Sequence, residues 1–238
     1  MPQVKTRIFA GDTCDQIVTC ISEEDAIKGR TRQKPERFAN DEERKKFNSA
    51  RSLRHFIRLF NTNFSENSLY TTLTFSDEYE VHTFQEAKKV CRKYYARLMY
   101  KYPAAKIVIV MGRGKSTERI HFHMVSDGIP EEYIEKQWKY GGIKRTVHLR
   151  AHVHYDGVDC GRDYKGLATY LYNHWTEEQG GHRYKASRTL EKPVQDRKET
   201  VCKRTYRPDR PPRAPRGFKF FDVQYNKYGW MEFHYIRV

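Results

Sequence analysis

The stretch Arg119-Ile120-His121-Phe122-His123-Met124-Val125 places two histidines on either side of one bulky apolar residue, inside an apolar run. Successive side chains of a β-strand point to opposite faces of the sheet, so His121 and His123 would share one face while Phe122 and Met124 enter the core. Two neutral imidazoles held side by side form half of a metal site. The run therefore predicts a strand with one core face and one metal-binding face.

Strand and helix signals lie on the N-terminal side of this run. Residues 69–75 are rich in β-branched and aromatic side chains and predict a buried strand. Residues 83–86 form a capping box for a helix that must stop before Pro103. Residues 106–111 predict a second buried strand, and residues 112–116 provide the turn of a β-hairpin that leads into the histidine strand.

Further elements are predicted on both sides of this core. A helix begins near Asn40, which can cap it. A second helix, capped by Asp163, carries Tyr170, and residues 218–238 form a final hairpin. Basic residues of the first helix lie off its apolar face, where they either line DNA or are simply solvated; they are Arg44, Lys45, Arg51, Arg54 and Arg58.

The order of these elements favours one α+β domain with a mainly antiparallel central sheet and flanking helices. We expect a polar N-terminal extension over residues 1–38, with a short strand at 4–9 and a helix around 23–28, and a core over residues 39–193. Residues 194–217 are rich in proline and basic residues and predict a loop without regular structure that crosses a DNA backbone. The hairpin at 218–238 is expected to belong to the same domain, with an extended segment at 147–154 inside the core.

The charge of the chain favours a nucleic-acid partner. The sequence holds 45 Lys and Arg against 30 Asp and Glu, a formal net charge of +15. Such a surplus attracts polyanions and makes binding salt-dependent. Aromatic and basic residues also alternate, as in residues 92–95 and 183–185, which suits base stacking combined with phosphate contacts.

The same composition argues against a membrane protein. No apolar run approaches the roughly 20 residues that a transmembrane helix needs, and the N-terminus lacks the apolar segment of a signal peptide. The cysteines show no CxxC spacing and are expected to be free thiols, so we predict a cytoplasmic protein. They are Cys14, Cys20, Cys91, Cys160 and Cys202.

A second His-x-His pair, His152 and His154, shows that the pattern alone is weak. We favour His121 and His123 because their strand has core residues on its other face and follows a hairpin. An H-E-x-x-H zinc motif is absent, and so is a phosphate-binding GxxxxGK[ST] loop.

Four blocks in order resemble the HUH endonuclease superfamily, in the group of rolling-circle replication initiators typified by filamentous-phage gene II proteins. The blocks span the strand at 69–75, the histidine strand at 120–125, the helix at 167–173 and the segment 183–193 with its Ser-Arg-x-Leu-x-x-Pro pattern. The resemblance implies a ferredoxin- or RRM-like fold, with His121 and His123 as metal ligands and Tyr170 as the nucleophile. Mg²⁺ or Mn²⁺ would be the metal.

Two positions depart from the pattern of the family. A lysine usually follows three residues after the tyrosine, where this chain has Asn173; His174, one turn from Tyr170, is a substitute. The third metal ligand is commonly an acidic residue at the end of the preceding strand, which here reads Met111-Gly112-Arg113. Glu118 would point to the opposite face of a regular strand, so the third ligand stays unassigned.

Two other tyrosines compete with Tyr170. Tyr172 faces about 160° away on a regular helix and is expected to pack or to stack on DNA, and Tyr164 lies near the helix start. Candidate phosphate contacts are Arg183, Lys185 and Arg188, with a merely solvated surface as the alternative.

The resemblance implies nicking and rejoining of single-stranded DNA at a rolling-circle origin through a 5′-phosphotyrosine intermediate. A host helicase and a host polymerase would be partners. A relaxase or single-strand transposase of the same superfamily is one alternative. A non-catalytic nucleic-acid-binding regulator on the same fold is another. A metal-storage or zinc-structural protein is a third, which the scattered Cys and His spacing opposes.

Overall fold

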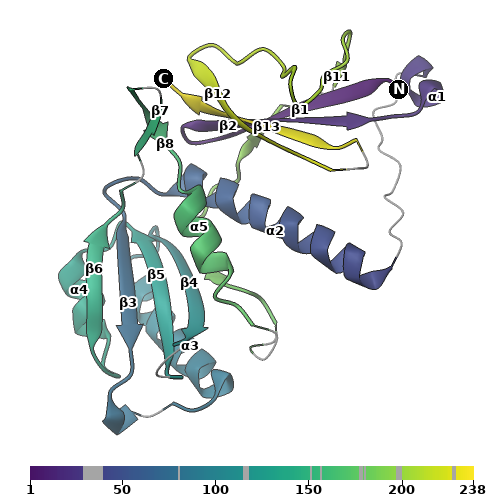
Figure 1. Ribbon diagram of the computed structural model, residues 1–238. Helices are drawn as coiled ribbons and strands as arrows, with labels where there is room; N and C mark the ends of the chain where they lie inside the picture. Colours follow the sequence, from purple (N-terminus) through teal and green to yellow (C-terminus); the bar gives the residue numbers. More distant parts are fainter. Residues whose placement is uncertain are drawn as a thin grey trace. The chain divides into compact units, whose positions relative to one another are not determined.

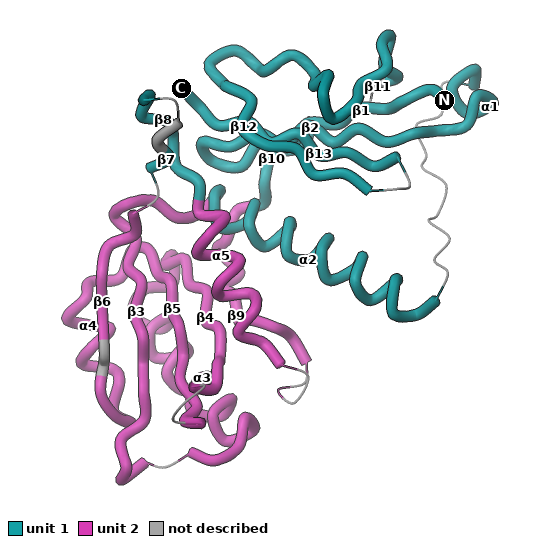
Figure 2. Tube along the Cα trace, in the orientation of Figure 1, with its two compact units in different colours: residues 1–62, 152–163, 192–238 teal, residues 63–151, 164–191 magenta. Residues whose placement is uncertain are grey.

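The computed structural model describes residues 1–28, 40–79, 81–114, 118–150, 152–155, 157–176, 179, 181–196, 200–226 and 229–238, without the side chains of residues 143, 144, 154, 155 and 200. It divides into two compact units (Figure 2). Unit 1 joins residues 1–62, 152–163 and 192–238, and unit 2 joins residues 63–151 and 164–191. Every strand pair that the described residues form is antiparallel, so the α+β class with a mainly antiparallel sheet is confirmed.

Unit 2 is built on a five-stranded sheet in the order β6-β3-β5-β4-β9 (Figure 1). Its strands are β3 (Leu69–Thr74), β4 (Lys106–Arg113), β5 (Ile120–Asp127), β6 (Ile143–His148) and β9 (Lys185–Ala186). Its helices are the short η1 (Asp77–Tyr79), α3 (Phe84–Lys101), α4 (Glu131–Gln137) and α5 (Lys165–Tyr172). The predicted hairpin is confirmed, since β4 and β5 pair along their full length, from Lys106 opposite Asp127 to Arg113 opposite Ile120.

The two faces of this sheet differ in what covers them. Ile120, Phe122 and Met124 of β5 are buried in one core with apolar side chains of α3 and α4. α3 forms because its capping box is present at Thr83 and its buried residues recur at helical spacing. α5 lies on the opposite face (Figure 1), on which His121 and His123 stand.

Unit 1 contains the second sheet, in the order β10-β1-β2-β13-β12, with β11 also paired to β1. Its long strands are β1 (Gln3–Ala10), β2 (Thr13–Cys20), β12 (Phe218–Tyr225) and β13 (Met231–Arg237). Its short strands are β10 (Val194–Gln195) and β11 (Thr200–Val201), and β7 (His152–Tyr155) pairs with β8 (Val158–Arg162) apart from the sheet. Its helices are α1 (Glu23–Ile27) and most of α2 (Asp41–Asn63).

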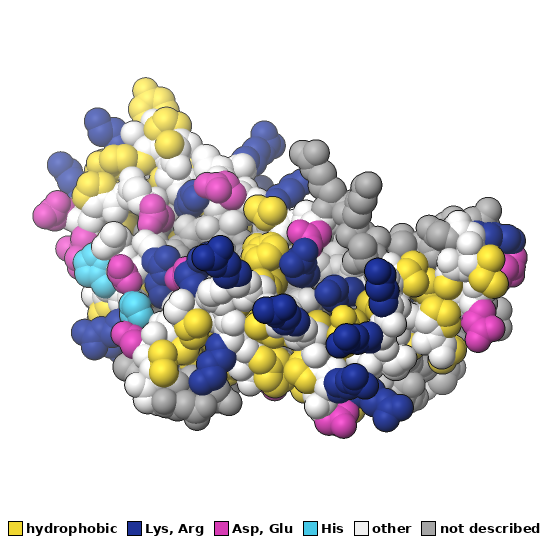
Figure 3. Space-filling model, turned by 90° about the horizontal axis from the view of Figure 1, so that it is seen from above, with side chains coloured by type: hydrophobic (Ala, Val, Ile, Leu, Met, Phe, Trp, Pro, Cys, Tyr) yellow, Lys and Arg dark blue, Asp and Glu magenta, His cyan; other side chains and the backbone are white. Residues whose placement is uncertain are grey.

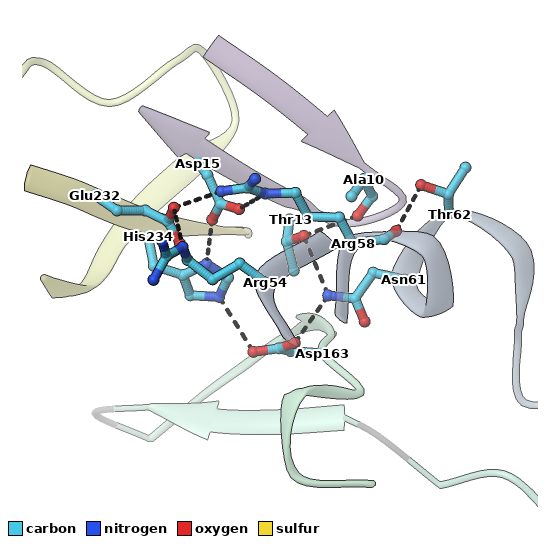
Figure 4. A network of polar contacts seen from close by, with 10 residues as sticks. All are labelled: Ala10, Thr13, Asp15, Arg54, Arg58, Asn61, Thr62, Asp163, Glu232 and His234. Atoms are coloured by element: carbon cyan, nitrogen blue, oxygen red, sulfur yellow. Dashed lines mark hydrogen bonds and ion pairs between the residues drawn. The ribbon is translucent and has the colours of Figure 1, made fainter. Parts of the chain in front are cut away.

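A buried network of charges joins α2 to the sheet of unit 1 (Figure 4). His234 donates from Nδ1 to Asp15 at 2.7 Å and from Nε2 to Asp163 at 3.1 Å. Arg58 donates to Asp15 and to Glu232, each at 2.5 Å. The burial of these side chains makes each pairing essential, because an unpaired charge here would be costly.

The network changes the interpretation of two predictions. Arg54 and Arg58 are largely buried, so they do not belong to a DNA-lining or solvated helix face. The N-cap position of α5 is Tyr164, not the predicted Asp163, and Tyr164 makes no side-chain capping bond. The carboxylate of Asp163 accepts hydrogen bonds from Asn61 and from His234.

The division into units also differs from the expected boundaries. The strand and the helix predicted in the first 28 residues are confirmed as β1 and α1. The segment is nevertheless not an extension, because β1 and β2 belong to the sheet of unit 1 and β2 pairs with β13 at the other end of the chain. Two further predictions were wrong in detail: residues 194–201 contain β10 and β11, and the extended segment at 147–154 is interrupted between β6 and β7. The hairpin of β12 and β13 is confirmed. None of the described helices has the length and hydropathy to cross a membrane.

The network predicts that unit 1 loses stability at alkaline pH. Burial lowers the pKa of His234, but the hydrogen bonds and charges of Asp15 and Asp163 outweigh it and raise the pKa from 6.5 to about 9. The stabilisation is complete below pH 6.5 and disappears as the pH rises through 9, a loss on the order of 3 kcal/mol. We expect urea unfolding, followed by hydrogen exchange of β13, to show this loss in the wild type and not in His234→Gln.

His152→Gln is the matched control, since His152 is a half-exposed histidine of the same unit. An equal loss of stability in His234→Gln and in the wild type would contradict the assignment.

Candidate functional site

The centre of the site is β5, the middle strand of the unit 2 sheet. Alternation along the strand brings His121 and His123 to the same face, opposite Thr74 and Thr72 of β3. Their Nε2 atoms lie 3.1 Å apart. The predicted pair is therefore assembled, with His123 buried and His121 partly buried.

A third imidazole joins them from the end of α5. The ring centroid of His174 lies 4.6 Å from that of His123 and 6.0 Å from that of His121. The three residues offer nitrogen atoms that all lie within 4.8 Å of one another. Within the part of the chain that the structure describes, no other group of three metal-binding side chains comes together in this way.

Hydrogen bonds at Nδ1 set the orientation of the three rings. His121 Nδ1 faces the carbonyl oxygen of Arg119 at 3.3 Å, and His174 Nδ1 faces that of Tyr170 at 2.8 Å. A carbonyl oxygen only accepts, so both rings carry their proton on Nδ1 and present the Nε2 lone pair. His123 Nδ1 lies 2.7 Å from the Tyr70 hydroxyl. Partners of this kind fix the tautomer of metal-ligating histidines.

The surroundings keep His123 uncharged. Burial, followed by the charges of His121 and His174, lowers the pKa of His123 from 6.5 to about 3. A neutral imidazole keeps the lone pair that a metal ion needs. Burial likewise raises the pKa of Tyr70, so that its hydroxyl stays protonated beside His123.

Gly112 leaves the space that the third imidazole, that of His174, occupies. This glycine pairs with His121 across β4 and β5, and a Cβ at its position would lie 2.7 Å from Cδ2 of His174. The imidazole of His174 thus fits beside the end of β4, where the chain carries no carboxylate. The sequence contained one signal for this placement, the spacing of one helical turn between Tyr170 and His174. Glu118 is exposed, has a φ of 52° and does not join the group.

The donor set discriminates between the two expected metals. Three imidazole nitrogens suit a transition-metal ion such as Mn²⁺ better than Mg²⁺, which prefers oxygen ligands in near-ideal octahedral geometry. The residues present therefore fit a divalent transition metal with open coordination positions.

Among the three candidate tyrosines, only Tyr170 is accessible. Its side chain is 51% exposed, and its ring centroid lies 4.3 Å from that of His174 and 5.6 Å from that of His123. Tyr172 and Tyr164 are buried. Asn173 is the exposed C-cap residue of α5 and takes no part in the histidine group.

The predicted phosphate contacts lie on the segment that follows α5. The guanidinium of Arg183 stands 4.4 Å from the ring centres of both Tyr172 and Trp175. Lys185 Nζ lies 4.1 Å from the ring centre of Tyr95, and Arg188 is exposed. Arg183 and Lys185 also line an open pocket of about 480 Å³. Cation–π contact orders both side chains, so their charges are held in place.

Among the described side chains, none joins His152 of the second His-x-His pair in a comparable group. His152 is half exposed on β7 and faces Asp159 at 3.7 Å, while the side chain of His154 lies outside the described residues. Cys14 and Cys20 both lie on β2 and join no metal-binding group with other described residues.

The fit of His174 against Gly112 predicts a selective loss of metal binding. In Gly112→Ala the new methyl group must displace His174, and we expect Mn²⁺ affinity to fall roughly 10- to 100-fold by isothermal titration calorimetry. Gly166→Ala is the control, because no atom lies within 4 Å of a Cβ at that position. Unchanged affinity in Gly112→Ala would exclude His174 as a ligand.

The contact of Tyr70 with His123 predicts a similar effect without a steric change. Tyr70→Phe removes only the hydroxyl that orients the imidazole, and we expect roughly 10-fold weaker Mn²⁺ binding with the fold intact. The comparison variant is Tyr100→Phe, which alters a 92% exposed tyrosine. Equal Mn²⁺ affinity in the two variants would refute the orienting role.

Comparison of the chain with protein-family models, with functionally characterised proteins and with experimentally solved structures gave no match.

Proposed function

We propose that this protein is a replication initiator that nicks and rejoins single-stranded DNA at a rolling-circle origin. The observation that carries the proposal is the exposed Tyr170 side chain next to three imidazoles whose ring nitrogens lie within 4.8 Å of one another. The ordered sequence blocks that resemble the HUH endonucleases support it, and so does the net charge of +15.

The reaction is a transesterification. The Tyr170 oxygen attacks the phosphorus of a DNA phosphodiester, and the bond from phosphorus to the 3′ oxygen breaks. The phenol loses one proton and the departing 3′ oxygen gains one, so no oxidant or cofactor turnover is needed. The products are a 5′-phosphotyrosyl enzyme and a free 3′-OH, which primes synthesis. Because the phosphotyrosyl bond conserves the energy of the original ester, attack by a 3′-OH rejoins the strand.

The residues of unit 2 would have different roles in this reaction. His121, His123 and His174 would hold a divalent metal ion, Mn²⁺ in preference to Mg²⁺, which would act as a Lewis acid and neutralise charge on the phosphoryl oxygens. Tyr70 and the carbonyl oxygens of Arg119 and Tyr170 keep the imidazoles oriented. The end of α5 places nucleophile and ligand one turn apart, because residues four positions apart lie on the same helix face.

The proposed reaction also implies a cellular compartment and partner proteins. The protein would act in the cytoplasm of the host cell on single-stranded origin DNA, with a host helicase for unwinding and a host polymerase to extend the 3′-OH. A relaxase or transposase would use the same chemistry on a different DNA. A non-catalytic regulator would bind DNA equally well without the three histidines and Tyr170.

The decisive test is the covalent adduct. We expect wild-type protein with Mn²⁺ and single-stranded DNA from its own replicon to give a DNA-shifted band on a denaturing gel. Tyr170→Phe abolishes the band because it removes the nucleophile, and His174→Ala lowers its yield at least 100-fold because a ligand is lost.

Tyr172→Phe is the matched control, since Tyr172 is a buried tyrosine on the same helix and its variant should form the adduct. An adduct that survives Tyr170→Phe would move the nucleophile elsewhere. Strong DNA binding without any adduct would favour the regulator.

A further inference from the structure

Unit 1 contains a basic pocket far from the histidine group in the sequence. The pocket has a volume of about 470 Å³ and is open to solvent. Five cationic side chains line it, and none of the described lining residues is acidic; the cations are Lys5, Lys203, Arg204, Arg210 and Arg213. Figure 3 shows Lys and Arg side chains gathered over the middle of the face turned to the viewer, whereas toward the left of the view acidic side chains lie among them.

The loop that supplies most of these cations is held in place. The side chain of Gln3, on β1, both donates to the carbonyl oxygen of Tyr206 at 3.0 Å and accepts from its N–H at 2.6 Å. Gln16 of β2 donates to the carbonyl oxygen of Arg213 at 2.9 Å, and Tyr235 of β13 donates to that of Pro212 at 2.6 Å. Gln3, Gln16 and Tyr235 are all buried.

This anchoring distinguishes the pocket from a solvated charge run. A flexible basic tail must lose conformational entropy when it binds, whereas three strands here fix the backbone before a ligand arrives. Arg207 and Arg210 also exchange backbone hydrogen bonds in a tight turn. The cost of holding like charges together is offset when an anion enters, which gives the pocket a preference for polyanions.

We propose that this pocket binds phosphate groups of the DNA backbone, as a second DNA contact outside the strand segment that Tyr170 attacks. Arginine forks suit phosphate oxygens, and the aromatic ring of Tyr206 offers a stacking surface beside Lys5, whose Nζ lies 5.7 Å from the ring centre. The proposal rests on the proposed function for the identity of the nucleic acid.

The test is the salt dependence of DNA binding by the full chain, measured by fluorescence anisotropy. All proteins carry Tyr170→Phe, so that binding is read without covalent chemistry. The pocket variant adds Lys203→Ala, Arg204→Ala and Arg210→Ala. The control variant instead adds Lys28→Ala, Lys46→Ala and Lys192→Ala, three exposed cations of unit 1 outside the pocket with the same total charge.

We expect the plot of log affinity against log salt to become shallower in the pocket variant only. Loss of three phosphate contacts lowers the slope by about 2 with a single strand and by about 3 with a duplex. Circular dichroism and thermal unfolding must match those of the control. Equal slopes for the two variants would overturn the proposal, because the attraction would then come from net charge alone.

A further arm separates DNA from free phosphates. If the pocket variant loses pyrophosphate binding by calorimetry but keeps the wild-type slope with DNA, the pocket takes small phosphates and the DNA contact is refuted. A protein that forms no Tyr170 adduct yet shows the pocket-specific change in slope refutes the proposed function and leaves the second contact standing.

Discussion

The alternation of side chains along β5 is the constraint on which unit 2 depends. Helices α3 and α4 cover one face of this central strand and α5 covers the other, so its register decides what each face receives. Phe122 and Met124 are almost fully buried, and each contributes about 1.5–3 kcal/mol through that burial. A slip by one residue would bury imidazoles in the apolar core and remove this stabilisation. The core of the unit therefore enforces the arrangement of the histidines.

The histidine group then needs three further conditions, and each comes from a different part of unit 2. The Tyr70 hydroxyl on β3 and the carbonyl oxygens of Arg119, just before β5, and of Tyr170 on α5 face the Nδ1 atoms. A glycine on β4 leaves room for the third ring. α5 ends close to this space and brings Tyr170 with it. Because these side chains are already fixed, binding of a metal ion or a substrate would cost less conformational entropy.

The sequence predicted the local elements well because their signals are local. Alternation marked β5, and the capping box at Thr83 and the apolar repeat marked α3. It did not predict the pairing of β2 with β13, since nothing in either segment identifies a partner at the opposite end of the chain. Asp163 is predicted as a helix cap because Asp is favoured before helices, but in the structure its carboxylate accepts hydrogen bonds from Asn61 and His234 of unit 1.

The site shows the same limit. His121 and His123 could be paired from a spacing of two, and the exposure of Tyr170 agrees with its expected place opposite the packed face of Tyr172. The sequence predicts that His174 lies beside Tyr170, one helical turn away. It does not predict that the imidazole of His174 fits into the space next to Gly112 and so reaches the other two histidines. Shape complementarity between two elements is a tertiary property, and single-residue patterns do not encode it.

The position of β13 between β2 and β12 has a consequence for how the chain matures. The sheet of unit 1 combines strands from both ends of the sequence. During synthesis, one long edge of β2 therefore stays unpaired until β13 has been made. Unpaired edges of this length invite association with other chains. Unit 2, whose strands are nearly contiguous, completes its sheet earlier. The nascent chain thus completes the sheet that carries the histidine group before the sheet that anchors the basic loop.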